Sequence, residues 1–247
     1  KLNQNRLKIR KMEQPEKDAF LAHATLPQFK SKVRRAKEEI ESAIALGNSY
    51  VGISWGKDSI VLLHLCQMIM PNIPAIHIKT PFQELLNNYK EVKTTYCRQY
   101  EPSYFEVDIE KECLIPQAIN TLKLWENYPV AITGVRAEEN PKKRGGVIKR
   151  YGLTSPYQSG ARRGSWRCWP LGYWKWRDVW AYICINDLPY LASYDHPLED
   201  TYARSRTTNI MPFTQYSVSH RKGRIEKMKM ISPKAHQFLK ENYPELC

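Results

Sequence analysis

Short apolar segments alternate with segments of helical length along residues 27–135. Strands are expected at residues 50–54, 75–79, 103–108 and 130–135, and helices at about residues 27–46, 58–70, 84–98 and 115–124. The first helix carries apolar residues at spacings of three and four, which indicates one buried face. Such alternation predicts an α/β fold with a doubly wound, mainly parallel sheet of the Rossmann type. In these sheets ligands bind beyond the carboxyl ends of the strands.

The chain is expected to form one domain with two appendages. Residues 1–27 are charged and indicate an N-terminal arm or a peripheral helix, and residues 28–190 the α/β nucleotide-binding domain. Residues 191–247 are expected as a basic, helical C-terminal extension packed on the same domain. Within the domain, residues 140–175 are dense in Gly, Pro, Arg and Trp, which indicates long loops before a helix at about residues 175–186.

Charge and cysteine usage limit the classes of partner and of cofactor. The formal net charge is +13, which favours an anionic partner such as a phosphate or a nucleic acid, or else a solvated basic surface. The longest apolar run, residues 60–70, is too short to span a bilayer, and no signal peptide is visible, so a cytoplasmic protein without membrane contact is expected. The six cysteines have no zinc or iron–sulfur spacing, so no such cluster is expected.

The segment "SWGKDS", Ser54 to Ser59, joins the first expected strand to the next helix. A strand–turn–helix directs the free N–H groups of the helix at the turn, and this arrangement binds anions. Here Gly56 would allow close approach of a phosphate, and Lys57 would supply charge. The spacing fits neither the Walker A loop nor the G-x-G-x-x-G dinucleotide loop. An ordinary turn before a capped helix remains the alternative.

The same segment resembles the S-G-G-K-D-S signature of the PP-loop, the pyrophosphate-holding turn of the adenine-nucleotide α-hydrolase superfamily. Residues 133–140, "TGVRAEEN", resemble that superfamily's later Gly-x-Arg-x-x-Glu loop, and residues 78–92 and 166–190 resemble segments of the phosphoadenosine-phosphosulfate (PAPS) reductases. The resemblance covers about residues 27–190. It implies an adenine nucleotide, ATP or PAPS, held by Ser54, Trp55, Gly56, Lys57, Asp58, Ser59, Thr80, Gly134 and Arg136.

Two departures from the family pattern bear on the reaction. Trp55 stands where the signature has a glycine, where it would pack against the nucleotide site or narrow it. The Glu-Cys-Gly-Leu-His tail that carries the catalytic thiol of PAPS reductases is absent from this sequence. The first hypothesis is therefore chemistry at the ATP α-phosphate, with pyrophosphate release and activation of an acceptor for sulfur transfer or a related substitution.

In that hypothesis Lys57, Asp58 and Arg136 are the catalytic residues. Asp58 is also the candidate Mg²⁺ ligand, and Arg136 would clamp the α-phosphate or instead form a surface salt bridge with Glu138 or Glu139. A sulfonucleotide reductase whose thiol lies on a missing tail or on a partner protein is the second hypothesis. A non-catalytic nucleotide or nucleic-acid binding subunit is the third.

The remaining candidates are basic residues and thiols. Arginines and lysines interleaved with Tyr and Trp are candidate contacts to an anion or a nucleic acid: Lys143, Arg144, Arg162, Arg163, Arg204 and Arg206. Cys168, beside Arg167, is either a reactive thiol or a buried residue, and Cys247 is the second candidate thiol. Assembly with a partner protein or with further copies of the chain is left open.

Overall fold

The computed structural model describes residues 12–79, 85, 88–108, 119, 122–195, 229, 232–242 and 244. Most of the helix expected at residues 115–124 lies outside the described residues, as do the candidates Thr80, Arg204, Arg206 and Cys247. No helix in the described part combines the length and the apolar character that crossing a membrane demands.

Six strands form one sheet in the order β3-β2-β1-β4-β6-β5. Their bounds are β1 Ser49–Gly52, β2 Ala75–Lys79, β3 Tyr104–Asp108, β4 Val130–Thr133, β5 Thr154–Pro156 and β6 Trp166–Cys168. Neighbouring strands are parallel except for β5, which pairs antiparallel with β6. The expected mainly parallel α/β sheet is therefore confirmed.

β1 lies between β2 and β4, so the strand order reverses on either side of it. The chain runs from β1 to β2 on one side and later returns to β4 on the other, in register from Ser49 opposite Val130 to Gly52 opposite Thr133. This is the switch point at which open α/β sheets bind ligands. The segments that follow β1 and β4 are therefore placed side by side at the carboxyl edge of the sheet.

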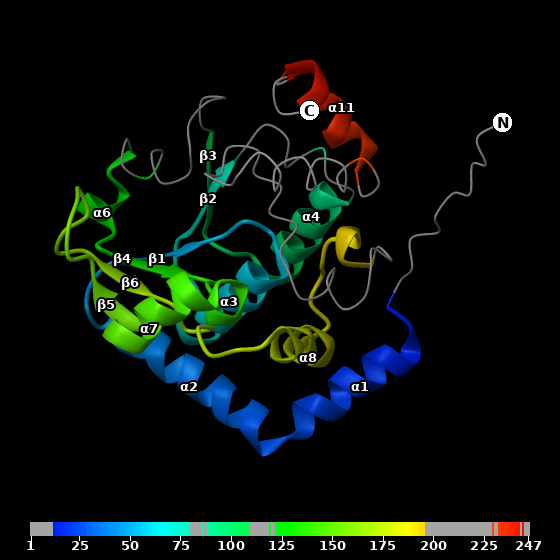
Figure 1. The fold of residues 1–247 in the computed structure, drawn as a ribbon, viewed down its shortest axis with the longest axis horizontal. Coiled ribbons are helices and arrows are strands. Elements are labelled where there is room, and N and C mark those ends of the chain that lie inside the picture. Colours follow the sequence, from blue (N-terminus) through cyan, green and yellow to red (C-terminus); the bar gives the residue numbers. More distant parts are fainter. Residues whose placement is uncertain are drawn as a thin grey trace.

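The main helices are α1 Gln14–Thr25, α2 Pro27–Ile44, α3 Lys57–Ile69, α4 Tyr89–Tyr100, α6 Leu124–Asn127, α7 Gly146–Tyr151, α8 Trp176–Asn186 and α11 Pro233–Asn242. Most of α3 is buried, because the sheet, α2 and α8 surround it. The buried part includes its apolar residues and also its polar first turn. In Figure 1, α1 and α2 run along one side of the molecule, with α8 above their junction. Phe20 of α1 packs on Trp176 and Trp180 of α8, so residues 14–25 form a packed peripheral helix.

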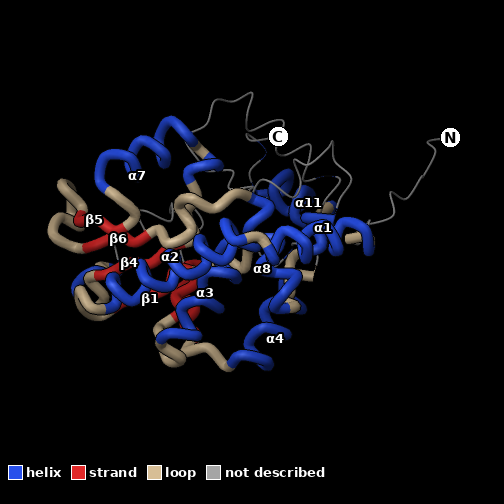
Figure 2. The backbone as a smooth tube through the Cα atoms, turned by 90° about the horizontal axis from the view of Figure 1, so that it is seen from below, coloured by secondary structure: helices blue, strands red, loops and turns tan. Residues whose placement is uncertain are grey.

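The expectation of long loops over residues 140–175 is wrong. The segment instead forms a π-helical turn at Pro141–Gly145, then α7, β5 and β6. The loop-like composition is explained by turns: Gly152, Gly160 and Gly164 adopt the left-handed region, with φ of 81°, 76° and 88°. Pairing of β6 with the distant β4 makes the segment part of the sheet, and Figure 2 shows α7 beside β5 and β6.

Candidate functional site

The turn after β1 takes its left-handed residue from Trp55, not from a glycine. Trp55 has φ 58°, whereas Gly56 lies in the extended region at φ −78° as the N-cap of α3. A left-handed conformation costs a non-glycine residue about 1–2 kcal/mol. The first glycine of the family signature therefore corresponds to a position with a left-handed backbone, which glycine adopts without strain. This chain has tryptophan there.

Contacts of the indole in the core offset this cost. The Trp55 side chain is fully buried, and its rings pack edge-on against Tyr96 and Tyr104 at centroid distances of 5.8 and 5.3 Å. Its Nε1–H donates a hydrogen bond to the Tyr104 hydroxyl at 3.1 Å. Such aromatic pairs contribute about 0.5–1.5 kcal/mol each beyond their buried area. The indole points into the core, away from solvent, so a nucleotide contact by Trp55 would come from its backbone.

Two serines close the turn on itself. The Ser59 hydroxyl donates to the Gly56 carbonyl oxygen at 2.9 Å and accepts from the Ser54 backbone N–H at 3.2 Å. The two Oγ atoms lie 3.3 Å apart. Ser54 is exposed while Ser59 is buried, so the pair connects the solvent side of the turn to its interior. Sequence and structure agree that these hydroxyls belong to the turn.

The N-terminus of α3 opens onto the turn, and its N-cap residue, Gly56, has no side chain to cap it. Uncapped N–H groups and the positive end of the helix dipole make such a terminus an anion-binding position. The hydroxyl of Tyr194, which accepts the Lys57 backbone N–H at 3.4 Å, lies over it. The Tyr194 ring centroid is also 5.4 Å from Lys57 Nζ. No local pattern in the sequence indicated Tyr194, which lies 137 residues after Lys57 along the chain.

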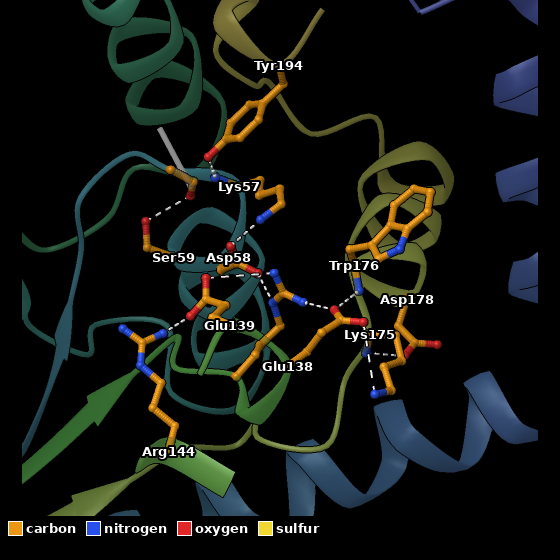
Figure 3. Close-up of polar contacts among 12 residues, drawn as sticks. Lys57, Asp58, Ser59, Glu138, Glu139, Arg144, Lys175, Trp176, Asp178 and Tyr194 are labelled. Carbon is orange, nitrogen blue, oxygen red and sulfur yellow. Dashed lines mark hydrogen bonds and ion pairs between the residues drawn. The ribbon is translucent and has the colours of Figure 1, made fainter. Parts of the chain in front are cut away.

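The three residues predicted to be catalytic lie in one buried charge network. Asp58 bridges the two cations: its Oδ2 is 2.5 Å from Lys57 Nζ, and its Oδ1 is 2.5 Å from Arg136 Nε. Figure 3 shows Lys57 and Asp58 meeting at the start of α3. Burial alone would raise the pKa of the Asp58 carboxyl, but the adjacent Lys57 and Arg136 charges outweigh it and hold that pKa below its ordinary value. Burial is also the main cause that lowers the pKa of Lys57.

The Arg136 guanidinium also forms ion pairs with two further carboxylates. Its Nη1 is 2.5 Å from Glu138 Oε2, and its Nη2 is 3.7 Å from Glu139 Oε1. The alternative interpretation of Arg136, a salt bridge with Glu138 or Glu139, is thus present in the structure, but its expected place at the surface is wrong, because the Arg136 side chain is fully buried. Three carboxylates, those of Asp58, Glu138 and Glu139, thus hold its guanidinium within the buried charge network.

Glu138 and Glu139 extend the network to neighbouring elements. Glu138 Oε2 accepts the Trp176 backbone N–H at 2.7 Å, which fastens the start of α8 (Figure 3). Glu139 forms an ion pair with Arg144. The segment after β4 therefore connects the turn after β1 with both α8 and the region before α7.

The Asp58 carboxylate does not fit a resident Mg²⁺. Both of its oxygens are bonded to cations, Lys57 and Arg136. The described residues also contain no group of three or more His, Cys, Asp or Glu side chains that could hold a metal ion. Magnesium prefers several oxygen ligands in octahedral geometry, and this donor set does not supply them.

Gly134 allows the segment after β4 to touch the first turn of α3. A Cβ at this position would lie 3.0 Å from both the backbone C and O of Asp58, and 3.2 Å from the Ser59 N. All three are backbone atoms that no side-chain rotation can move. The close approach requires glycine here, and it brings Arg136 within reach of Asp58.

The other candidates lie away from the turn. Lys143 is exposed, and its backbone N–H donates to Asn140 Oδ1; Arg162 and Arg163 lie in the turn between β5 and β6. Cys168 is fully buried, with its Sγ 3.2 Å from Thr154 Oγ1. Burial raises the pKa of this thiol to about 12, which describes an inert thiol and not a nucleophile.

Comparison with known proteins identifies a family for the chain. Residues 48–200, more than half of the chain, match the family model of the phosphoadenosine phosphosulfate reductase domain. Adenosine 5′-phosphosulfate reductase of Lysinibacillus sphaericus (strain C3-41) is 26% identical over 180 residues, which are 62% of this chain and 69% of that protein. The enzyme of the same name from Geobacillus thermodenitrificans (strain NG80-2) is 24% identical over 161 residues, 58% of this chain and 65% of that protein.

A solved structure shares the fold alone. Yeast FAD synthetase in complex with FAD superposes with a TM-score of 0.50 at 14% sequence identity, covering 72% of this chain and 67% of that one. The matches to the curated relatives span about two thirds of their lengths. The sheet with its switch point, the turn after β1 and the family match lead to the same assignment: the chain belongs to the phosphoadenosine phosphosulfate reductase domain family.

Proposed function

We propose that the protein is a sulfonucleotide reductase that binds adenosine 5′-phosphosulfate or its 3′-phosphorylated form at the turn after β1. The observation that carries the proposal is the uncapped N-terminus of α3 beside Lys57, at the switch point between β1 and β4. Membership of the reductase domain family and the two relatives with that activity in their names support the same substrate class.

In this proposal the turn holds the phosphate part of the substrate. The first N–H groups of α3 and the Ser54 hydroxyl donate to phosphate oxygens, and Lys57 neutralises their charge. When Lys57 turns to the anion, Arg136 stays on Asp58, so the buried carboxylate keeps one cationic partner. Arg136 and Asp58 then act as positioning residues.

The reaction needs a thiolate that attacks the sulfur of the phosphosulfate group. A sulfur–sulfur bond forms, the bond from sulfur to the phosphate oxygen breaks, and the nucleotide leaves with the electron pair. A second thiol then attacks the enzyme sulfur, so a disulfide forms and sulfite is released. Cys168 is too deeply buried for this role, so we assign the first thiol to Cys247 or to a partner protein.

The burial of Cys168 also favours a second candidate, in which no enzyme thiol is needed. There an acceptor oxygen attacks the α-phosphorus of ATP and pyrophosphate leaves. Catalysis would come from positioning and charge neutralisation at the same turn. Lys57 and the α3 N-terminus would then hold the leaving pyrophosphate.

One experiment separates the two candidates. The full chain is incubated with adenosine 5′-phosphosulfate, with PAPS or with ATP, in the presence of a dithiol reductant and of thioredoxin, and sulfite and pyrophosphate are measured. Sulfite that is lost in Lys57→Gln and retained in Lys30→Gln, an exposed residue of α2, supports the first proposal. Pyrophosphate from ATP alone supports the second candidate. Failure of all three nucleotides to bind the folded protein would refute both.

A further inference from the structure

A second basic region, separate from the turn after β1, lies on the sheet edge formed by β5 and β6. Residues 140–177 contain ten Lys and Arg residues and no Asp or Glu. Two of the ten have acidic partners just before the segment: Arg144 pairs with Glu139, and Lys175 lies 4.0 Å from Glu138. The segment therefore carries a strong excess of positive charge that local acidic residues do not balance.

Within this segment arginines and tyrosines alternate in space. The Arg150 guanidinium lies 5.1 Å from the Tyr151 ring centroid, and Arg167 lies 5.8 Å from the same ring. Arg167 is also 5.5 Å from the Tyr157 ring, which in turn has Arg162 at 4.5 Å. We call these five residues, in the order Arg150, Tyr151, Arg167, Tyr157 and Arg162, the Arg–Tyr ladder. Each tyrosine ring has two guanidinium groups within 6 Å of its centroid.

The centre of the ladder is held in place by the sheet. Arg167 belongs to β6, and its Nε–H donates to the Ser155 hydroxyl of β5 at 3.0 Å. Its guanidinium also lies 5.1 Å from the Trp169 ring. Arg167 is only partly exposed, so the rigid edge of the sheet fixes the middle of the ladder.

The Arg150 end of the ladder is exposed, and the Arg162 end is partly exposed. Arg150 is exposed, and Tyr151, the last residue of α7, exposes 37% of its surface; Tyr157 and Arg162 are half-buried. β5 is the last strand of the sheet. Figures 1 and 2 both show β5, β6 and α7 together at one end of the molecule, opposite α11.

We propose that the Arg–Tyr ladder binds single-stranded nucleic acid. Bases stack on Tyr151 and Tyr157, and the arginines contact the phosphates between them. Single strands match this surface, because their bases are free to stack on aromatic rings and each nucleotide also carries a negatively charged phosphate. In a duplex the bases are already stacked on each other, so only the arginines would find partners. The inference is independent of the reductase proposal.

The test compares ligands that have equal charge but differ in their bases. A fluorescein-labelled oligothymidylate of about 20 nucleotides, an abasic oligomer of the same length and a duplex of about 10 base pairs, which carries the same charge, are titrated with the full chain by fluorescence anisotropy. Oligothymidylate is expected to bind at least about tenfold more tightly than the abasic oligomer. The double variant Tyr151→Ala/Tyr157→Ala is expected to lose at least about tenfold in affinity for oligothymidylate and to bind the abasic oligomer as the wild type does.

The arginines are tested by the salt dependence of binding. Arg150→Gln/Arg162→Gln is expected to weaken binding of both oligomers, and to reduce the slope of log K against log salt by about 1.4, since each phosphate contact to a single strand contributes about 0.7. The control Lys30→Gln/Arg98→Gln removes the same charge from exposed residues of α2 and α4, and is expected to bind as the wild type does. Thermal unfolding checks that each variant is folded.

Three results would overturn the proposal. The first is equal affinity of the wild type for oligothymidylate and the abasic oligomer, which would mean a polyanion surface without stacking. Tighter binding to the duplex, or to an acidic peptide of equal charge, would point to another class of partner. The third is loss of affinity in the Lys30/Arg98 control equal to that in the ladder variants.

Discussion

Gly134 is the position at which a single methyl group has the clearest expected effect on the site. The added Cβ of Gly134→Ala would lie 3.0 Å from the backbone C and O of Asp58 and 3.2 Å from the Ser59 N. The backbone φ of Gly134 is not in the left-handed region, so the effect is steric. Because backbone atoms cannot rotate away, β4 and α3 must separate by several tenths of an ångström. Overpacking of this kind costs about 1–3 kcal/mol.

The separation would also displace the first N–H groups of α3 and the Asp58–Arg136 contact. A misplacement of this size is expected to weaken nucleotide binding by about tenfold, since catalytic and binding geometry tolerates errors well below 1 Å. Urea unfolding gives the loss in free energy of unfolding, and titration calorimetry with adenosine 5′-phosphosulfate gives the loss in affinity. Both quantities should change together.

Gly146→Ala is the matched control for Gly134→Ala. The same methyl group at this α7 position would have no atom within 4 Å, so stability is expected to stay equal or rise by up to about 1 kcal/mol, with unchanged affinity. If Gly134→Ala were as stable as the wild type and bound the nucleotide equally well, the close approach of β4 to α3 would be refuted. The same holds if both glycine variants lost equal stability.

Three further predictions concern buried groups. Asp58→Asn leaves Lys57 and Arg136 without the carboxylate between them and is expected to lower the free energy of unfolding by about 3–5 kcal/mol in urea titrations; a loss under about 1 kcal/mol would contradict the network. Burial raises the pKa of the Cys168 thiol to about 12, so this thiol should not react with a thiol reagent at neutral pH until the protein unfolds. Cys168→Ala should keep the wild-type activity. Rapid labelling of the thiol in the native protein, or loss of activity in the variant, would contradict the conclusion that Cys168 is inert. Burial raises the pKa of the Asp58 and Asp178 carboxyls, but their partners outweigh it and hold both pKa values below 3.8: Lys57 and Arg136 beside Asp58, and Lys32 and His23 beside Asp178. The stability that these carboxylates contribute is present above that pH and is lost as the pH falls through the folded-state pKa values. The midpoint of thermal unfolding should therefore drop steeply below about pH 4, and less so in Asp178→Asn.

Local patterns predicted the parallel core of the sheet well. β2 spans the expected residues 75–79, and α8 begins one residue after the expected start, because apolar periodicity and helix-breaking residues are local signals. β5 and β6 were not predicted. Each of these strands is three residues long and forms only by pairing with another strand, β6 with β4 and β5 with β6. No local sequence pattern encodes such a partner.

The site was predicted as far as its residues are neighbours in sequence. The turn from Ser54 to Ser59 and the pairing of Arg136 with Glu138 follow from local motifs and short separations. The contact between Arg136 and Asp58, which are 78 residues apart, was not predicted, because it depends on the order of the strands. The Trp55 ring was expected to pack against the nucleotide site or to narrow it. Its packing in the core was not predicted for the same reason, since its partner Tyr104 lies on β3.

The central claim is that the N-terminus of α3, with Lys57, holds the phosphate part of an adenine sulfonucleotide. Titration calorimetry of the wild type and of Lys57→Met with adenosine 5′-phosphosulfate, and with adenosine as the ligand without phosphate, tests it most directly. The account predicts that Lys57→Met, shown by thermal unfolding to be folded, loses at least about tenfold in affinity for the sulfonucleotide because a charge-assisted contact is removed, while adenosine binds both proteins equally. Equal affinity of both proteins for adenosine 5′-phosphosulfate would contradict it.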